Sequence, residues 1–324
     1  MSKFVKYFNI ALLVALVGVI GFGLTHSRQI LDYFALRGYN PSSRVVELAS
    51  ATTMNDKTRN VFYVNHPNLQ DRKQFAGSCT QAEQTIVLGC FIENKGIYLL
   101  EVDDSRLQGI VEVTTAHETL HAMYARLSGD ERTKIDKMTA KFFATLDNPR
   151  IKENIENYRK KDSGVVPNEL HSILGTEVRD LSPELEEYYS QYFKDRKAIV
   201  AFSEKYEQTF IDIENQVKAY DTQLKSLKIE IETKETQIQS LGRQVDAERN
   251  RLDSLIKSHK IGEYNASVEG YNSLVNQYNS LIRSRQAQAE QYNVIVDKYN
   301  SLATTESDLI KALKTDDIKP IGGV

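Results

Sequence analysis

The residues His117-Glu118-Thr119-Leu120-His121 form the pattern in this sequence that is best suited to chemistry. Residues four apart share one face of a helix, so the two imidazole rings could bind one Zn²⁺ ion. Glu118 lies between them and could take a proton from a water molecule whose pKa the metal lowers towards about 7. The pattern therefore predicts a hydrolytic zinc site, with His117 and His121 as ligands and Glu118 as the general base.

The residues around this motif favour a buried helix. Between positions 113 and 125 the ionisable side chains are those of the motif and Tyr124, and most of the others are apolar. A helix at the protein surface usually carries lysine or glutamate in such a window. The run 103–105 offers caps for a helix that begins near Arg106, and Gly129 ends it. The alternative is a structural helix whose histidines only pack or face solvent.

A catalytic zinc ion needs a third protein ligand, which a carboxylate downstream of the motif can supply. The run 167–172, Pro-Asn-Glu-Leu-His-Ser, is the best candidate, with Glu169 as the ligand. Glu177 is the alternative third ligand, because it lies two helical turns later on nearly the same face. If Glu169 binds the metal, Glu177 is expected to orient a histidine. His171 points elsewhere on this helix and could meet a substrate oxyanion or make an ordinary polar contact.

With these two motifs the chain resembles the gluzincin metallopeptidases, and the run around Glu169 is similar to the NExxS-type run of the thermolysin-like enzymes. The resemblance implies that Glu169 is the third zinc ligand and that Ser172 lets the ligand helix approach the active helix closely. It also implies that a strand within 85–102 forms the upper edge of the cleft. Glu169 follows His121 at a much greater distance than in thermolysin, and Ile173 stands where an aspartate often follows. The subfamily is therefore not identifiable.

The composition is that of a folded chain, with 41% hydrophobic and 26% charged residues. Runs 61–64 and 97–102 are typical of strands, and residues 131–146 predict a helix. Residues 151–167 are polar, and within them 160–164 predict an exposed loop over or beside the site. The net charge of −3 and the lack of a basic stripe predict no nucleic-acid partner.

The N-terminus predicts a membrane segment. Residues 7–25 contain no charged side chain, and Lys3 and Lys6 precede them. A helix of this length spans roughly 28 Å, close to the hydrocarbon core of a bilayer, which favours an uncleaved signal anchor. A signal peptide that is cleaved near residues 21–23 is the alternative. The expected localisation is a single-pass membrane protein with its catalytic domain outside the cytoplasm.

The two cysteines, Cys79 and Cys90, flank the strand-like run 85–88. A pair placed across a hairpin or loop suits a disulfide, which persists outside the cytoplasm. Two buried thiols are the alternative. Zinc binding by this pair is not expected, because the spacing lacks a CxxC pattern.

From about Leu181 the sequence changes character and becomes poor in Gly and Pro, and a seven-residue repeat that starts at Phe210 is interrupted at 258–262 and then resumes. Two such series predict two long helices that fold back as an antiparallel coiled-coil hairpin. Self-association through the same heptads is the alternative. The first series is Phe210, Val217, Leu224, Ile231, Ile238, Val245 and Leu252, and the second is Tyr264, Tyr271, Tyr278, Tyr292 and Tyr299.

The predicted fold is thus an α+β zincin-like catalytic domain followed by a long antiparallel coiled-coil hairpin, with one N-terminal transmembrane helix. The expected domains are the anchor 1–36, the metallopeptidase domain 37–202, the hairpin 203–313 and a flexible tail 314–324. The predicted function is a membrane-anchored zinc metallopeptidase acting on a protein or peptide substrate, with a possible protein partner on the coiled coil. The alternative is a non-catalytic coiled-coil envelope scaffold with a metal-binding zincin-like domain.

Overall fold

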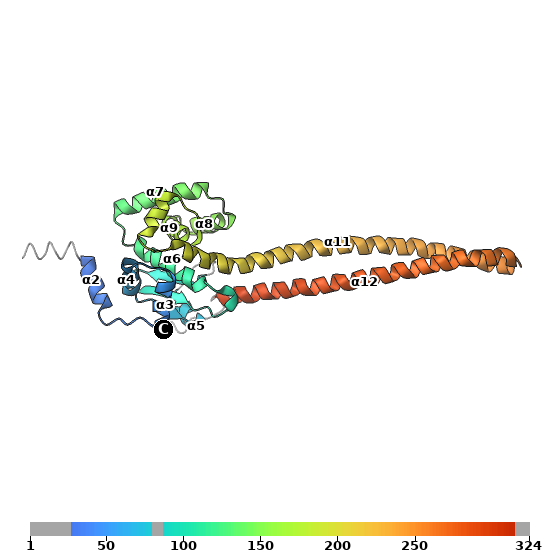
Figure 1. Cartoon of the computed structure of the whole chain (residues 1–324), viewed down its shortest axis with the longest axis horizontal. Helices are drawn as coiled ribbons and strands as arrows, with labels where there is room; N and C mark the ends of the chain where they lie inside the picture. Colours follow the sequence, from blue (N-terminus) through green and yellow to red (C-terminus); the bar gives the residue numbers. More distant parts are fainter. Residues whose placement is uncertain (1–26, 80–86, 315–324) are drawn as a thin grey trace, which may run out of the picture. The chain divides into compact units, whose positions relative to one another are not determined.

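The computed structural model describes residues 27–79 and 87–314, which are predominantly helical (Figure 1). Described residues up to Thr209, together with those from Ile310 onward, form one compact unit, and Phe210–Leu309 forms a second. The elements of the first unit, in chain order, are α2 (Ser27–Leu36), α3 (Ser43–Ala51), α4 (Asp56–Val64), β1 (Asn68–Gln70), α5 (Arg72–Ser78), β2 (Gly89–Ile92), β3 (Gly96–Leu100), the 3₁₀ turn Ser105–Leu107, α6 (Ile110–Tyr124), α7 (Gly129–Thr145), α8 (Pro149–Lys161), α9 (Val166–Glu177) and α10 (Pro183–Ser190).

The expected α+β class is wrong, because the described sheet has only three short strands and helices make up most of the first unit. Residues 61–64, predicted as a strand, form the last part of α4. The Asn55 side chain caps this helix by accepting a hydrogen bond from the backbone N–H of Thr58. Thr58, Val61 and Phe62 then bury one helical face. The cap and this spacing outweigh the strand preference of a valine-rich run.

The predicted transmembrane helix and the single-pass membrane localisation also need correction. Among the described residues, no helix is both long enough and apolar enough to cross a bilayer. Residues 7–25, on which the prediction rests, lie outside the described residues. The first described helix, α2, has 10 residues and spans about 15 Å, half the thickness of a bilayer core. The structure therefore gives no support to a single-pass membrane fold.

Helix α6 lies at the centre of the first unit, where it packs against α3, α4, α9 and the sheet. Nearly all of its faces are buried, because it is covered by neighbouring elements on several sides. It begins at Ile110 rather than near Arg106. Gly109 adopts a φ of +99°, which ends the preceding 3₁₀ turn and redirects the chain into α6.

The sheet places its edge strand, β2, against α6. The strand order is β1-β3-β2, with β1 parallel and β2 antiparallel to β3, so that Gly89 pairs with Leu99. A disulfide joins Cys79, just after α5, to Cys90 in β2, with an S–S distance of 1.99 Å. The sequence left this pairing open, and the structure shows the crosslink. It ties the edge strand to the helix that packs behind the sheet.

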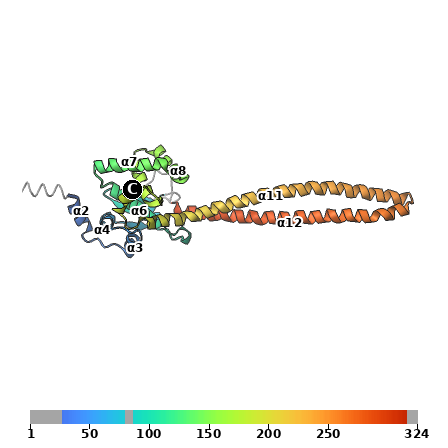
Figure 2. The same cartoon turned by 45° about the horizontal axis from the view of Figure 1, so that its top comes forward.

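The predicted pair of long helices is present, as α11 (Arg196–Lys257) and α12 (Ile261–Leu313). Within the second unit they run alongside each other (Figure 2). His259 adopts a φ of +56° in the short turn that joins them. An ion pair links the two helices, with Arg285 of α12 and Glu235 of α11 at 3.2 Å.

Candidate metal centre

Three side chains that were candidates for metal ligands converge in the first unit. His117 and His121 on α6 and Glu169 on α9 place their ligand atoms within 4.8 Å of one another. The two Nε2 atoms lie 3.0 Å apart, and each lies 3.6 Å from a carboxylate oxygen of Glu169. Ligands at about 2.0–2.1 Å from one tetrahedral ion are separated by roughly 3.3–3.4 Å. The observed separations lie on either side of this value, so the group could hold a metal ion.

The surroundings of Glu169 fit a charged metal ligand. Its Oε2 atom is buried and has no hydrogen-bond partner among the described residues. Burial disfavours the charged form of this carboxylate and acts to raise its pKa. His117, His121 and a hydrogen bond from Tyr158 favour the charged form more strongly, so the pKa of Glu169 lies below its usual value. A buried, charged carboxylate oxygen facing two imidazole nitrogens is the donor arrangement that a divalent ion requires.

Close approach of α6 and α9 brings the ligands together. A Cβ atom on Gly175 would lie only 2.5 Å from Cδ1 of Leu120 and 2.8 Å from the Tyr189 ring, so glycine is needed at this crossing. Ser172, fully buried on α9, places its Oγ atom 3.2 Å from Nδ1 of His121. This hydroxyl can accept the Nδ1 hydrogen and keep Nε2 directed at the metal position.

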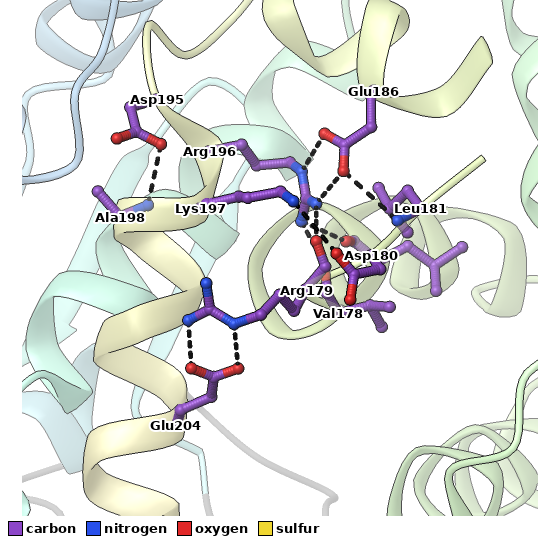
Figure 3. Close-up of polar contacts among 11 residues, drawn as sticks. Val178, Arg179, Asp180, Leu181, Glu186, Asp195, Arg196, Lys197, Ala198 and Glu204 are labelled. Carbon is purple, nitrogen blue, oxygen red and sulfur yellow. Dashed lines mark hydrogen bonds and ion pairs between the residues drawn. The ribbon is translucent and has the colours of Figure 1, made fainter. Parts of the chain in front are cut away.

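Arg196, at the start of α11, holds the end of α9 (Figure 3). Its guanidinium donates to the backbone carbonyls of Val178 at 2.5 Å and Arg179 at 2.7 Å. Glu186 accepts two further hydrogen bonds from the same group, at 2.6 and 3.0 Å. The Arg196 side chain is only 3% exposed, so Glu186 compensates a charge that would otherwise be buried alone. These contacts satisfy carbonyls just beyond the ligand helix and fix its end.

Glu118 lies in the same cleft as the three candidate ligands and against the edge strand. The residue is 5% exposed. A Cβ atom on Gly89 would lie 2.7 Å from Cγ and 3.0 Å from Oε1 of Glu118. The edge strand therefore packs directly on the predicted general base, and it can do so because Gly89 has no side chain.

Helix α8 forms a wall of the cleft, whose volume is about 370 Å³. Arg150, Asn154 and Tyr158 lie on one face of α8 and line this cleft. These three residues were not among the candidates predicted from the sequence, which showed only a polar stretch from 151 onward. Asn148 caps the helix and Pro149 occupies its first turn. An N-cap followed by proline is the signal that could have revealed it.

The structure separates the other candidate residues from the metal position. Glu177 pairs with Arg150 at 2.9 Å and is not part of the ligand group. His171 is fully buried, and its Nε2 atom lies 3.0 Å from the hydroxyl of Tyr188. Burial, with a smaller effect of the motif histidines, lowers the pKa of His171 to about 3, so this ring is neutral. It does not line the cleft and makes a structural polar contact.

Comparison with protein-family models, with curated proteins and with solved structures finds no match to this chain. The resemblance to gluzincins therefore remains a prediction from two short motifs. The functional argument depends on the geometry of the candidate metal centre itself.

Proposed function

We propose that this chain is a zinc-dependent metallopeptidase in which Glu118 acts as the general base. The convergence of His117, His121 and Glu169 in a cleft, with Glu118 beside them, carries this proposal. Two imidazole nitrogens and one carboxylate oxygen, with a further position open, are a common ligand set of catalytic zinc. The same ligand set supports the resemblance to the gluzincins.

Different residues of the site have different roles in the proposed hydrolysis. A bound zinc ion would supply Lewis-acid chemistry, by polarising the scissile carbonyl and lowering the pKa of a water molecule. Glu118 takes the proton of the attacking water and returns it to the leaving amine. Ser172 orients His121 through Nδ1, and Tyr158 holds the carboxylate of Glu169 by a hydrogen bond.

A peptide substrate is supported by the edge strand. Residues 89–91 of β2 line the cleft, and β2 is one of the two edge strands of the described sheet. An edge strand offers backbone N–H and C=O groups that can pair with an extended peptide. Such pairing would lay a peptide across the metal position and beside Glu118.

A non-catalytic scaffold is the second candidate, and the long helices α11 and α12 favour it. Paired helices of this length can bind a protein partner or a second copy of the chain. A scaffold could use His117, His121 and Glu169 to bind a structural metal ion, but it has no need of a general base. Glu118 therefore separates the two functions.

The first test is the zinc content of the full-length protein, measured by elemental analysis. We expect about one zinc ion per chain, lost in His121→Ala and in Glu169→Ala. Glu177→Ala is the matched control, since its carboxylate lies outside the ligand group and its loss should leave zinc bound. A folded, zinc-supplied protein that contains no zinc contradicts the proposal.

The second test is the hydrolysis of a mixed peptide library by wild type and Glu118→Gln, followed by mass spectrometry. We expect Glu118→Gln to retain zinc and to lose about 10²- to 10⁴-fold in rate, the usual contribution of a general base. Equal cleavage by both proteins would contradict the role of Glu118. Bound zinc with no cleavage by wild type would favour the scaffold.

A further inference from the structure

Besides the candidate ligands, α6, α8 and α9 contribute further side chains to the cleft, and we call the part that these side chains line the side pocket. Its walls are the buried apolar side chains of Ile110, Val113 and Ile173. Glu177 and Arg150 also line the cleft and form the charged part that we call its end. The side pocket therefore combines apolar side chains with an ion pair.

The end of the side pocket carries more negative than positive charge. Nη2 of Arg150 donates to Oε2 of Glu177 at 2.9 Å and to Oε1 of Glu207 at 2.6 Å. Two carboxylates thus share one guanidinium nitrogen, so that these three side chains comprise two acidic groups and one basic group. The Glu177 side chain is only 10% exposed, and in such surroundings its interaction with an incoming charge is strengthened.

We propose that the side pocket binds a lysine or arginine side chain of the substrate, next to the bond that is cut, and that Glu177 is the specificity-determining residue. This inference rests on the proposed peptidase function. The aliphatic stem of such a side chain packs on apolar walls while its cationic head pairs with a carboxylate. A substrate carboxylate would instead add a third negative group around the single guanidinium of Arg150.

The length of the side pocket also selects for these side chains. Glu177 lies two helical turns beyond the ligand Glu169 on α9, roughly 12 Å along the helix axis. A residue whose carbonyl is held at the metal position needs a long side chain to approach Glu177. Lysine and arginine have the longest cationic side chains and carry the complementary charge.

Binding of amino-acid hydroxamates to the zinc-loaded full-length protein tests the proposal without requiring turnover. Hydroxamates bind zinc directly, and their side chains can sample the side pocket. Lysine and norleucine hydroxamates share an aliphatic stem, but only lysine has the ammonium group. Isothermal titration calorimetry should show that lysine hydroxamate binds about tenfold more tightly than norleucine hydroxamate. This is the ratio expected for one charge-assisted hydrogen bond. Glutamate hydroxamate should bind more weakly than either.

Glu177→Gln should bring the lysine-to-norleucine ratio close to one while retaining zinc. Glu153→Gln is the matched control, because Glu153 is an exposed carboxylate on α8 that does not line the cleft, and its ratio should match wild type. Thermal unfolding checks that each variant folds. If Glu177→Gln does not fold, the comparison of the three hydroxamates on wild type still decides the question.

Equal binding of lysine and norleucine hydroxamates overturns the inference and leaves the peptidase proposal standing. Tightest binding of glutamate hydroxamate also overturns it and assigns the end of the pocket to carboxylate recognition by Arg150. Loss of zinc in Glu177→Gln overturns it by giving Glu177 a role at the metal. If no hydroxamate binds the zinc-loaded protein, the proposed function fails and the inference fails with it.

Discussion

Gly89→Ala is the substitution that best isolates the proposed role of Glu118. A Cβ atom at position 89 would lie 2.6 Å from Cγ2 of Thr114, 2.7 Å from Cγ of Glu118 and 3.0 Å from its Oε1. Gly89 is not among the residues with positive φ, so alanine brings no backbone strain and its effect is steric. The perturbation is one methyl group placed against the general base.

The size of the effect follows from these distances. Favourable carbon contacts lie at about 3.5–4.0 Å, so Glu118 or the strand must move by roughly 1 Å. The hydroxyl of Thr114 donates to the carbonyl of Ile110 at 2.7 Å, which limits how far this side chain can rotate away. A displacement of about 1 Å at a reacting group can lower the rate about 100-fold, and overpacking costs about 1–3 kcal/mol of stability. The metal ligands are not among the contacts, so zinc should stay bound.

The assay combines zinc content, thermal unfolding and kcat/KM on a peptide that wild type cleaves. We expect full zinc content, a modest fall in Tm and a loss of about 100-fold in kcat/KM. Gly77→Ala is the control, because a Cβ atom there has no neighbour within 4 Å. Unchanged activity in Gly89→Ala would refute the reasoning, and so would a loss of activity that only follows a loss of zinc.

Three further substitutions test how the metal centre is held. Gly175→Ala should separate α6 from α9, because its Cβ atom would lie 2.5 Å from Leu120. Zinc affinity and Tm should therefore both fall, and an unchanged affinity in a zinc competition titration would count against this. Ser172→Ala removes the hydroxyl beside Nδ1 of His121 and should weaken zinc binding about 10- to 100-fold with little change in fold, which circular dichroism checks. Cys79→Ser removes the crosslink to β2 and should lower the free energy of unfolding by about 2–4 kcal/mol in denaturant titrations, with reduced wild type as the comparison. If Cys79→Ser and reduced wild type both unfold at the same denaturant midpoint as oxidised wild type, the disulfide contributes nothing to stability.

The relation between the motif histidines could be predicted because it is local. His117 and His121 are one turn apart, and any regular helix brings their rings together. The choice between Glu169 and Glu177 could not be made in this way, since both lie on nearly the same face of one helix. It depends on where α9 crosses α6, and Gly175 sets that crossing. Sequence periodicity shows which residues share a face of a helix. It does not show at which residue along the axis a second helix crosses it.

The errors in the predicted fold have a similar origin. Residues 61–64 have the composition of a strand, but the cap at Asn55 and the buried face of α4 decide their structure. Residues 151–161 belong to a helix that their polar composition did not predict, because their charged side chains hide two buried isoleucines, Ile151 and Ile155, spaced one turn apart. In both segments the start signal of the helix was present in the sequence and carried more information than composition.

The first turns of α11 belong physically with the metal centre, although this helix continues into the second unit. Arg196 binds the carbonyls that follow the ligand helix, and Glu207 holds Arg150 at the end of the side pocket. The heptad series begins at Phe210, which is also the first residue of the second unit. Before Phe210 the side chains of α11 pack against the first unit and organise the site. After Phe210 the apolar positions of the repeat pack only against a partner helix. The onset of strict seven-residue periodicity therefore marks where α11 stops contributing to the cleft.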